Sequence, residues 1–203
     1  MAKQSRSAPV MKTVLDAVAE RLIAGDELLI RIPEICEATG VNYGSVYHHF
    51  GSREGVIDAA YNLIFSQMVE EDIALCRNAT SEAETLEEYI AATLPIVGAI
   101  NSGPERVARR ALRVRIIAAA ETRPELHELI SETQSRLTEE WRLLVEFAQR
   151  REWLRNDISS SFLAVFFQVL VFGRALDDIS DKPLDEEDWG VSLATLFVHL
   201  LRQ

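Results

Sequence analysis

The sequence predicts an all-α protein in which a small N-terminal helix-turn-helix domain precedes a larger helical domain. Apolar residues recur at helical spacing almost throughout, and alternating strand patterns do not occur. The 203 residues include only nine Gly and six Pro. A chain of this length can bury roughly 70% of its unfolded surface, enough for one or two domains with a real core. We expect about nine helices, with domains at residues 1–55 and 56–203.

Four helices are expected to start within roughly the first 55 residues, and the middle two are short. The first ends near Gly25, the second ends at Gly40, the third runs from Asn42 to about Phe50, and the fourth begins after Ser52. Gly40 can adopt a positive φ at a helix C-terminus, and Asn42 is a favourable N-cap. Two short helices joined by so tight a turn are typical of a helix-turn-helix motif.

Longer helices are expected in the rest of the chain, at about 82–101, 105–121, 125–152, 159–180 and 186–202. The fourth of these is apolar nearly all round, and such a helix must be covered on every side. A symmetric partner could supply the missing cover, as in a two-fold dimer. The alternative is that it forms the central helix of a monomeric core.

The charge of the chain is strongly acidic but unevenly placed. The formal net charge of −11 argues against general affinity for nucleic acids, because phosphate binding depends on Lys and Arg. Residues 1–55 hold six Lys/Arg and seven Asp/Glu, whereas residues 56–203 hold 15 and 25. The N-terminal quarter is therefore close to neutral, and the acidity belongs to the rest.

Three features of the sequence predict a cytoplasmic protein with no membrane partner. The cysteines, Cys36 and Cys76, form no CxxC pair, which fits a reducing compartment. The N-terminus lacks the apolar segment of a signal peptide. The longest apolar run, at 162–173, is too short for a transmembrane helix.

Residues 40–53, GVNYGSVYHHFGSR, gather neutral polar and aromatic groups on one short helix. Val46 and Phe50 share a face that can pack against the preceding helices. The opposite face and its flank carry Asn42, Tyr43, Gly44, Ser45, Tyr47, His48 and His49. Hydroxyl, amide and imidazole groups donate to phosphate oxygens without a formal charge. An acidic protein could therefore still bind DNA through this helix, although Tyr47 could also be only a core neighbour of Phe50.

The segment at 30–61, IRIPEICEATGVNYGSVYHHFGSREGVIDAAY, resembles the DNA-binding signature of the TetR family of bacterial transcriptional regulators. The matching residues are Ile35, Cys36, Gly40, Val41, Gly44, Tyr47, His49, Phe50, Arg53 and Glu54. The resemblance implies that the third helix enters the major groove of double-stranded DNA. It also implies a two-fold dimer, formed through the last two helices, on a palindromic operator.

By this resemblance, Tyr47, His49 and Arg53 would contact phosphates, and other residues of the third helix would approach the bases or the sugar–phosphate edge. The second helix departs from the family pattern, because Arg31 and Pro33 replace the usual capping Ser or Thr and the polar residue that follows it. Arg31 is a candidate to replace the lost phosphate contact. The DNA-binding candidates are thus Arg31, Asn42, Tyr43, Gly44, Ser45, Tyr47, His48, His49 and Arg53.

The resemblance further implies a small-molecule effector that binds in the helical body and weakens DNA binding. Our candidates for that site are Tyr61, Phe65, Met68, Tyr89 and Trp141, although core packing explains these residues equally well. Arginines stand nearby and could instead pair with carboxylates of neighbouring helices: Arg109, Arg110, Arg113 and Arg115. Our candidates for the dimer interface are Phe162, Phe166, Val169, Leu170, Gly173, Leu193, Phe197 and Leu200.

The sequence therefore predicts a homodimeric DNA-binding transcriptional regulator, a repressor that a small molecule releases from its operator. The alternative is a helical adaptor that has lost DNA binding. We predict no catalytic residue and no cofactor, because P-loop, GxGxxG, nucleophile-elbow and HExxH motifs do not occur. We also predict no metal, because His48 and His49 point about 100° apart on a helix and have no acidic or Cys partner at ligand spacing.

Overall fold

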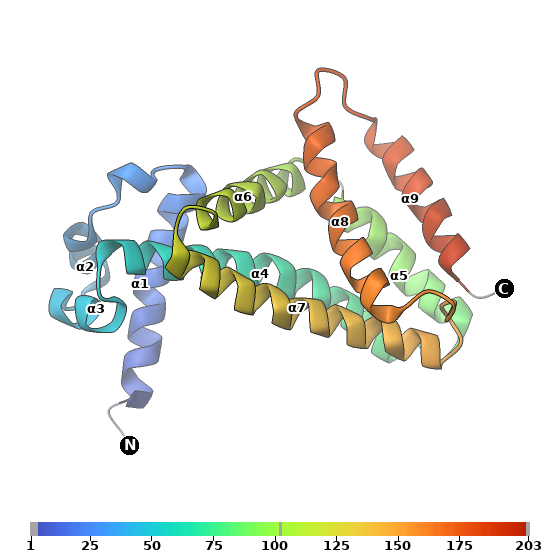
Figure 1. Ribbon diagram of the computed structural model, residues 1–203, viewed down its shortest axis with the longest axis horizontal. Coiled ribbons are helices and arrows are strands. Elements are labelled where there is room, and N and C mark those ends of the chain that lie inside the picture. Colours follow the sequence, from blue (N-terminus) through green and yellow to red (C-terminus); the bar gives the residue numbers. More distant parts are fainter. Residues whose placement is uncertain (1–3, 102, 202–203) are drawn as a thin grey trace. The chain divides into compact units, whose positions relative to one another are not determined.

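The computed structural model describes the backbone of residues 4–101 and 103–201, and the side chains of residues 9–98 and 103–201. These residues form nine α-helices and no β-strand, which confirms the predicted all-α class (Figure 1). The helices are α1 Gln4–Ala24, α2 Ile32–Thr39, α3 Tyr43–Phe50, α4 Arg53–Glu82, α5 Leu86–Asn101, α6 Pro104–Ala120, α7 Pro124–Arg150, α8 Ser160–Asp178 and α9 Glu186–Leu200. A short 3-10 helix, η1 at Glu27–Leu29, was not expected from the sequence.

By packing, the chain divides into two compact units. Unit 1 comprises Met1–Gln67 and Ile116–Thr133, and unit 2 comprises Met68–Arg115 and Gln134–Gln203. The divisions fall within α4, α6 and α7, so each of these helices contributes residues to both units. The domain boundary predicted at residue 55 marks the end of the DNA-binding signature, whereas these units are defined by packing. The predicted boundary therefore stays a prediction.

Unit 1 is held together by the apolar faces of its first four helices. Residues that are 1% exposed or less include Val14, Val18, Leu22, Ile32, Ile35, Val46 and Ile57. Gly40 ends α2 in the left-handed conformation, with φ of 69°, as the sequence predicts. The Val41 N–H then donates to the Cys36 carbonyl over 3.1 Å, which closes the turn before α3. This turn fixes the direction in which α3 leaves α2.

The backbone turn between α3 and α4 is so close that it requires a glycine at position 55. A Cβ added to Gly55 would lie 2.1 Å from the Phe50 carbonyl oxygen, a distance that real Cβ atoms do not reach. The Gly55 N–H meanwhile donates to the Ser52 hydroxyl over 2.9 Å, which caps the start of α4. Gly55 thus allows the end of α3 and the start of α4 to pack together.

We predict that Gly55→Ala destabilises the protein by about 2 kcal/mol, because the backbone must move to admit the methyl group. For a chain of this size, that cost lowers the Tm by about 4–8 °C. Gly98→Ala is the matched control, since nothing lies within 4 Å of a Cβ at Gly98, in the last turn of α5. Thermal melts by circular dichroism compare the two. Equal Tm values for Gly55→Ala and wild type would contradict the close approach.

An ionic network in unit 1 joins η1 to α4 and to the turn that precedes α7. The Glu27 carboxylate accepts from the Tyr61 hydroxyl over 2.7 Å and from Arg123 Nη1 over 2.8 Å. Arg123 also pairs with Asp58, and its guanidinium lies 5.6 Å from the Tyr61 ring centroid. Burial raises the pKa of Asp58, and Arg123 opposes that rise. The network holds the segment between α1 and α2 in place.

Unit 2 has a separate apolar core, in which the Tyr89 ring of α5 stacks on Trp153 with 5.0 Å between the centroids. Within this unit α5 packs against both α8 and α9 (Figure 1). The Arg155 N–H donates to the Leu200 carbonyl over 3.0 Å and ties the α7–α8 loop to the end of α9. The buried members of this core are Ala83, Tyr89, Val145, Ala148, Trp153, Leu154, Leu163, Phe197 and Leu201.

Candidate nucleic-acid interface

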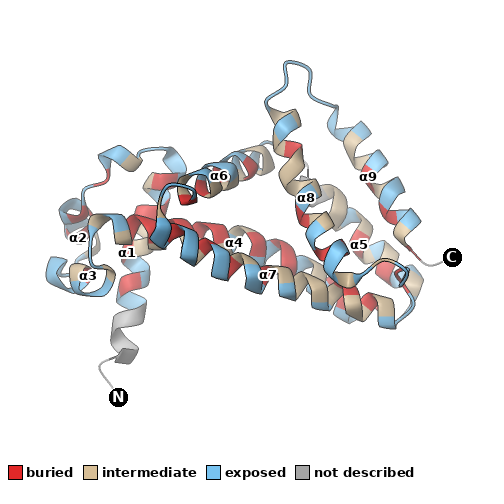
Figure 2. Cartoon of the chain, in the orientation of Figure 1, coloured by how far each residue is buried: buried red, intermediate tan, exposed pale blue. Residues whose placement is uncertain are grey.

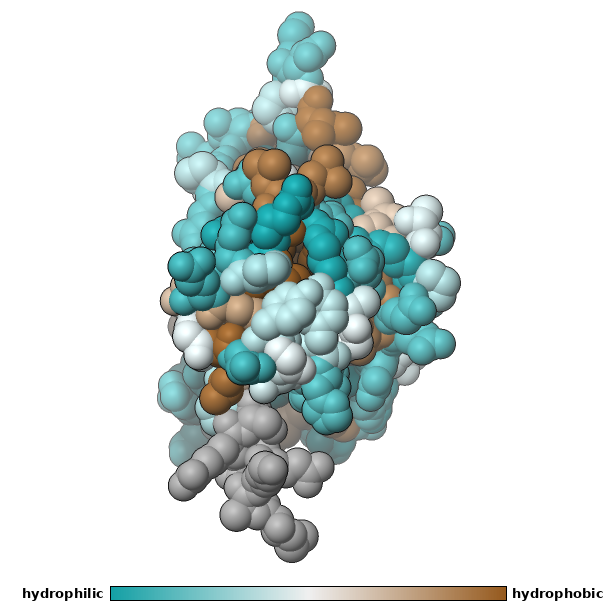
Figure 3. Space-filling view, turned by 90° about the vertical axis from the view of Figure 1, so that its left-hand side faces the viewer, coloured by the Kyte–Doolittle hydropathy of each residue, from teal (hydrophilic) through white to brown (hydrophobic). Residues whose placement is uncertain are grey.

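Helix α3 presents its polar and aromatic face to solvent, as the helical wheel predicts. Val46 is fully buried and Phe50 is half-buried, whereas Tyr43 is 46% exposed (Figure 2). Asn42, Gly44, Ser45, His48 and His49 are also exposed. Figure 3 looks at the side on which α2 and α3 lie, and its surface there is mainly hydrophilic. The exposed face of α3 therefore offers several neutral hydrogen-bond donors to a ligand.

The start of α3 is capped by Asn42, whose Oδ1 accepts from the Ser45 N–H over 3.3 Å. Gly44 leaves room for this cap, because a Cβ at that position would lie 3.1 Å from Asn42 Oδ1. A glycine within a helix costs about 1 kcal/mol relative to alanine. The room that the Asn42 cap needs explains why a glycine stands at this position. The cap uses only Oδ1 of this exposed residue, so the Asn42 side-chain N–H2 group is not needed for it.

We predict that Asn42→Ala lowers the free energy of unfolding by about 1 kcal/mol, because the first turn of α3 loses its cap. Asn42→Ser restores a capping oxygen and is expected to unfold at the wild-type Tm, while it lacks the amide that could contact a base. Thermal melts of both variants test the cap. A wild-type Tm for Asn42→Ala would contradict it.

The aromatic residues of α3 support one another. The rings of Tyr43 and Tyr47 lie 4.5 Å apart between centroids, and His49 meets Phe50 edge-on at 4.6 Å. The hydrogen bond with Tyr43 is the main cause that raises the pKa of Tyr47. The raised pKa leaves the Tyr47 phenol protonated at neutral pH, and the half-buried side chain lies beside the exposed face of the helix.

Both arginines among the predicted DNA contacts donate to backbone carbonyls of unit 1. Arg53 Nε donates to the Ile30 carbonyl over 3.1 Å, and its Nη2 donates to the Glu27 carbonyl over 2.7 Å. Arg31 Nη1 donates to the Leu28 carbonyl over 3.0 Å. Replacing Arg53 by alanine would therefore disturb the fold as well as the charge. Any phosphate contact by these residues would use the remaining guanidinium hydrogens.

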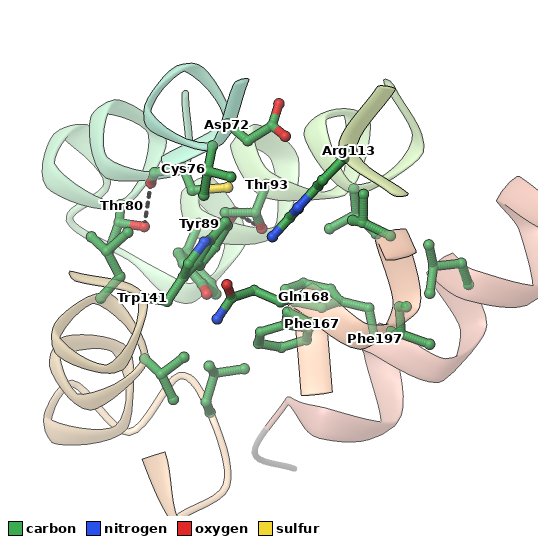
Figure 4. A pocket seen from close by; sticks show the side chains of 18 residues that line it. Asp72, Cys76, Thr80, Tyr89, Thr93, Arg113, Trp141, Phe167, Gln168 and Phe197 are labelled. Atoms are coloured by element: carbon green, nitrogen blue, oxygen red, sulfur yellow. Dashed lines mark hydrogen bonds between the residues drawn. The ribbon is translucent and has the colours of Figure 1, made fainter. Parts of the chain in front are cut away.

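Unit 2 contains a cavity of about 100 Å3, lined by residues of several helices (Figure 4). Of the residues predicted for an effector site, Tyr89 and Trp141 line it, and Met68 lines a smaller hollow nearby. Tyr61 and Phe65 do not, because they are buried within unit 1. The α4 residues that face the cavity lie further along the same helix, at Val69, Asp72, Cys76 and Thr80.

Two of the α6 arginines named from the sequence form ion pairs, and a third lines the cavity. Arg109 Nη1 lies 2.6 Å from Glu71 Oε2, and Arg110 Nε lies 2.6 Å from Asp178 Oδ2. Arg115 is exposed. Arg113 lines the cavity and points into it in Figure 4. Pairing with carboxylates, the alternative left open by the sequence, is observed for Arg109 and Arg110.

The last two helices carry an exposed apolar surface. On α8 and its C-cap we define the α8 stripe as Phe162, Val165, Val169, Leu176 and Ile179, which are 49–83% exposed. Phe162 and Val169 belong to the predicted interface, and Phe166, Leu170, Gly173 and Leu200 are half-buried. Leu193 and Phe197, in contrast, are 6% exposed because they face the cavity and core of the same chain. The exposed apolar residues of α9 are Val191, Leu196 and Val198.

By length and composition alone, α8 is the one helix among the described residues that could cross a membrane. The apolar run at 162–173 lies within this helix, which has 19 residues and a mean hydropathy of 1.4, so by these two measures the helix is not too short to cross a membrane. Only 22% of this window is buried within the chain. Its Gln168 amide nevertheless donates to Thr138 Oγ1 over 3.2 Å, and Arg174 Nη2 donates to the Leu184 carbonyl over 3.0 Å. These polar contacts tie α8 to α7 and to the segment before α9 within the same chain.

The N-terminal segment matches a known family. Residues 15–60, which contain α2 and α3, match the family model described as bacterial regulatory proteins, tetR family. The chain is also 24% identical over 184 residues to the HTH-type transcriptional regulator UidR of Escherichia coli strain K12. That similarity covers 91% of this chain and 88% of UidR. It therefore extends well beyond the helix-turn-helix segment.

Solved structures share the fold over nearly the whole chain. A putative TetR-family transcriptional regulator from Rhodococcus sp. superimposes with a TM-score of 0.65 at 22% identity, covering 95% of this chain and 98% of that one. A putative transcriptional regulator from Saccharomonospora viridis, solved in complex with choline, gives a TM-score of 0.62 at 13% identity, covering 99% and 100%. The combination of a helix-turn-helix segment with a helical body is thus shared with these regulators.

Proposed function

Because the chain belongs to the TetR family of DNA-binding bacterial transcriptional regulators, we propose that it is a homodimeric repressor released from its operator by a small molecule. It acts in the cytoplasm, on a palindromic site in double-stranded DNA. Neither catalysis nor a cofactor has a part in this function. The observation that carries the proposal is the exposed, capped and uncharged face of α3 on an otherwise acidic chain.

In this proposal α3 enters the major groove. Tyr47 and His49 donate to phosphates from the exposed side of the helix, while Tyr43 and His48 approach the base edges. The face of α3 holds no carboxylate that would repel the phosphates. The N–H groups at the start of α3 form the positive end of the helix dipole, and this end favours the binding of an anion such as a phosphate. Neutral donors thus replace the Lys and Arg side chains on which most DNA-binding surfaces depend.

The dimer is proposed to form through α8 and α9, around the α8 stripe. The five apolar side chains of the α8 stripe are 49–83% exposed, and soluble proteins rarely leave a large apolar surface uncovered. A second copy of the same stripe, related by a two-fold axis, covers it with matching chemistry. The two reading helices of such a dimer address the two halves of a palindrome.

The cavity in unit 2 is proposed to hold the effector. It is lined by residues of α4, α6 and α7, and these three helices also supply residues to unit 1. A ligand that changes the packing of these helices would change the population of conformations that can bind DNA. By linkage, operator DNA then weakens effector binding by the same factor.

A transcriptional reporter tests repression. The region upstream of the gene is fused to a reporter in a host that lacks the gene, and wild-type protein or a variant is supplied from a second plasmid. We expect wild-type protein to lower reporter output. Tyr47→Phe combined with His49→Ala is expected to restore it at equal protein level. Repression would be contradicted if wild-type protein bound this region in vitro but left reporter output unchanged. The proposal that the protein binds DNA would then still stand.

A further inference from the structure

The segment that contains α2 and α3 is closed on itself by one side chain, that of Arg53. Arg53 is the first residue of α4, and its Nε donates to the Ile30 carbonyl over 3.1 Å. Its Nη2 donates to the Glu27 carbonyl over 2.7 Å. In the chain, Ile30 comes just before α2 and Arg53 comes just after α3 (Figure 1). The two hydrogen bonds therefore join the two ends of the helix-turn-helix segment.

The Ile30 carbonyl needs a hydrogen-bond donor. Ile30 is fully buried, and a buried carbonyl without a partner is costly. The next residue, Arg31, is the N-cap of α2, but its side chain makes no capping hydrogen bond. The Arg31 guanidinium donates instead to the Leu28 carbonyl over 3.0 Å. Because the start of α2 has no side-chain cap, the contact from Arg53 to the preceding residue helps to hold it.

The second acceptor, Glu27, is itself fixed by its side chain. Its carboxylate accepts from the Tyr61 hydroxyl over 2.7 Å and from Arg123 Nη1 over 2.8 Å. Arg123 also pairs with Asp58 of α4, which is buried. Contacts from α4 and from the turn before α7 thus set the place of Glu27. Through the Glu27 carbonyl, Arg53 attaches the helix-turn-helix segment to this network.

The same geometry makes Arg53 a poor ligand for a phosphate. Its side chain is 30% exposed, and Nε and Nη2 already donate to carbonyls. The third nitrogen, Nη1, lies 3.5 Å from Glu54 Oε1. The Glu54 side chain is 67% exposed, so a phosphate beside Nη1 would also approach a carboxylate. Repulsion between these two negative charges would offset the attraction of the guanidinium.

We propose that Arg53 is a positioning residue, which sets the direction of α3 through the carbonyls of Glu27 and Ile30 and does not itself contact DNA. The inference rests on the proposed function, because it requires that α3 reads DNA. A planar guanidinium donates in a fixed fork, which the ammonium group of a lysine does not reproduce. A protein whose α3 is correctly placed for only a fraction of the time binds its operator more weakly by that fraction.

The variant Arg53→Lys separates the two roles, because it keeps the charge and loses the fork. Operator DNA is first selected from random duplexes with the wild type, and affinity is measured by fluorescence anisotropy at a temperature at which both proteins are folded. We expect Arg53→Lys to bind about tenfold more weakly, since one hydrogen bond from a charged donor is lost. Wild-type affinity would overturn the proposal, because a phosphate contact requires only the charge.

The variant Arg53→Met tests the same point through salt dependence. The logarithm of the binding constant falls by about 0.9 per phosphate contact for each unit in the logarithm of salt concentration. We expect weaker binding with the wild-type slope, whereas a slope shallower by about 0.9 would overturn the proposal. The control for net charge is Arg150→Met, since Arg150 is an exposed residue of α7 that pairs with Glu146. If Arg53→Met fails to fold, Arg53→Lys still decides.

A scrambled duplex distinguishes a displaced α3 from a smaller amount of folded protein. Loss of folded protein lowers the affinity for operator and for scrambled DNA by the same factor. Displacement of α3 lowers the affinity for the operator alone, because non-specific binding depends on charge, which Arg53→Lys retains. Equal losses on the two duplexes would overturn the positioning role and leave Arg53 with a role in stability only.

Hydrogen exchange without DNA keeps this inference apart from the proposed function. We expect peptides from residues 30–53 to exchange faster in Arg53→Lys than in the wild type, and peptides of α8 to exchange equally. Unchanged exchange at 30–53 would overturn the anchoring by Arg53, even if DNA binding by the wild type stands. A wild type that selects no DNA would overturn the proposed function, and faster exchange would then support the anchoring alone.

Discussion

Tyr47→Phe combined with His49→Ala is expected to weaken binding to operator DNA about 100-fold. A hydrogen bond to a charged acceptor contributes about 1.5–3 kcal/mol, and every 1.4 kcal/mol is a factor of ten. Two lost phosphate contacts thus account for the effect. Fluorescence anisotropy against labelled duplex measures it. The fold should survive, because the buried residue of α3 is Val46 and it is unchanged.

A matched control removes the same chemical groups elsewhere. Tyr89→Phe combined with His127→Ala deletes one phenol hydroxyl and one imidazole outside α3. We expect this variant to bind operator DNA with wild-type affinity. The contrast would fail if both double variants lost affinity equally, since the loss would then come from the fold rather than from α3.

The salt dependence of binding separates neutral donors from charged ones. The logarithm of the binding constant falls with the logarithm of salt concentration by about 0.9 for each phosphate neutralised by Lys or Arg. Tyr47→Phe removes no charge, so the slope of this plot should remain that of the wild type while the affinity falls. A shallower slope in Tyr47→Phe would show that the helix had lost its position on the DNA.

Val169→Arg is expected to convert the dimer into a monomer and to abolish tight binding to a palindromic operator. Val169 is 56% exposed in the single chain, so an arginine there is compatible with the folded protomer. At a two-fold interface the change occurs twice, and two guanidinium groups would be buried without partners, at a cost of several kcal/mol. Light scattering measures the mass, and anisotropy measures the affinity for DNA.

The control for this variant is Leu75→Arg, which places the same charge on α4 at a residue that is 44% exposed. It should remain dimeric and bind DNA like the wild type. A dimeric Val169→Arg variant would contradict the placement of the interface on the α8 stripe. A monomeric variant with full affinity for the palindrome would contradict the need for a dimer.

The helix-turn-helix segment could be predicted from the sequence because its signals are local. Gly40 needs a positive φ and Asn42 needs only the N–H of Ser45, three residues away. The two short helices on either side of this turn follow from a few residues of apolar spacing. Gly55 was missed, although a glycine in the first turn of a helix, three residues after a capping serine, is a signal that could have indicated a close approach of two backbones.

The cavity and the roles of the arginines depend on contacts between distant segments. Arg53 donates to carbonyls 23 and 26 residues earlier, which no local pattern shows. The stripe of α4 that contains Tyr61 continues along 30 residues. The periodicity of the sequence gives the spacing of the apolar residues on α4. It does not show at which residue this stripe stops packing in the core of unit 1 and starts to line the cavity of unit 2. For the same reason Leu193 and Phe197 could not be separated from the exposed apolar residues of α9.

The most direct test of the central claim, that α3 reads DNA as part of a two-fold dimer, is selection of binding sites from random duplex DNA. The wild-type protein and the Tyr47→Phe, His49→Ala variant are selected in parallel. We predict that the wild type enriches one palindromic sequence and saturates it at two protomers or a multiple of two, while the variant enriches none. Enrichment of the same sequence by both proteins, or of no sequence by the wild type, would contradict the claim.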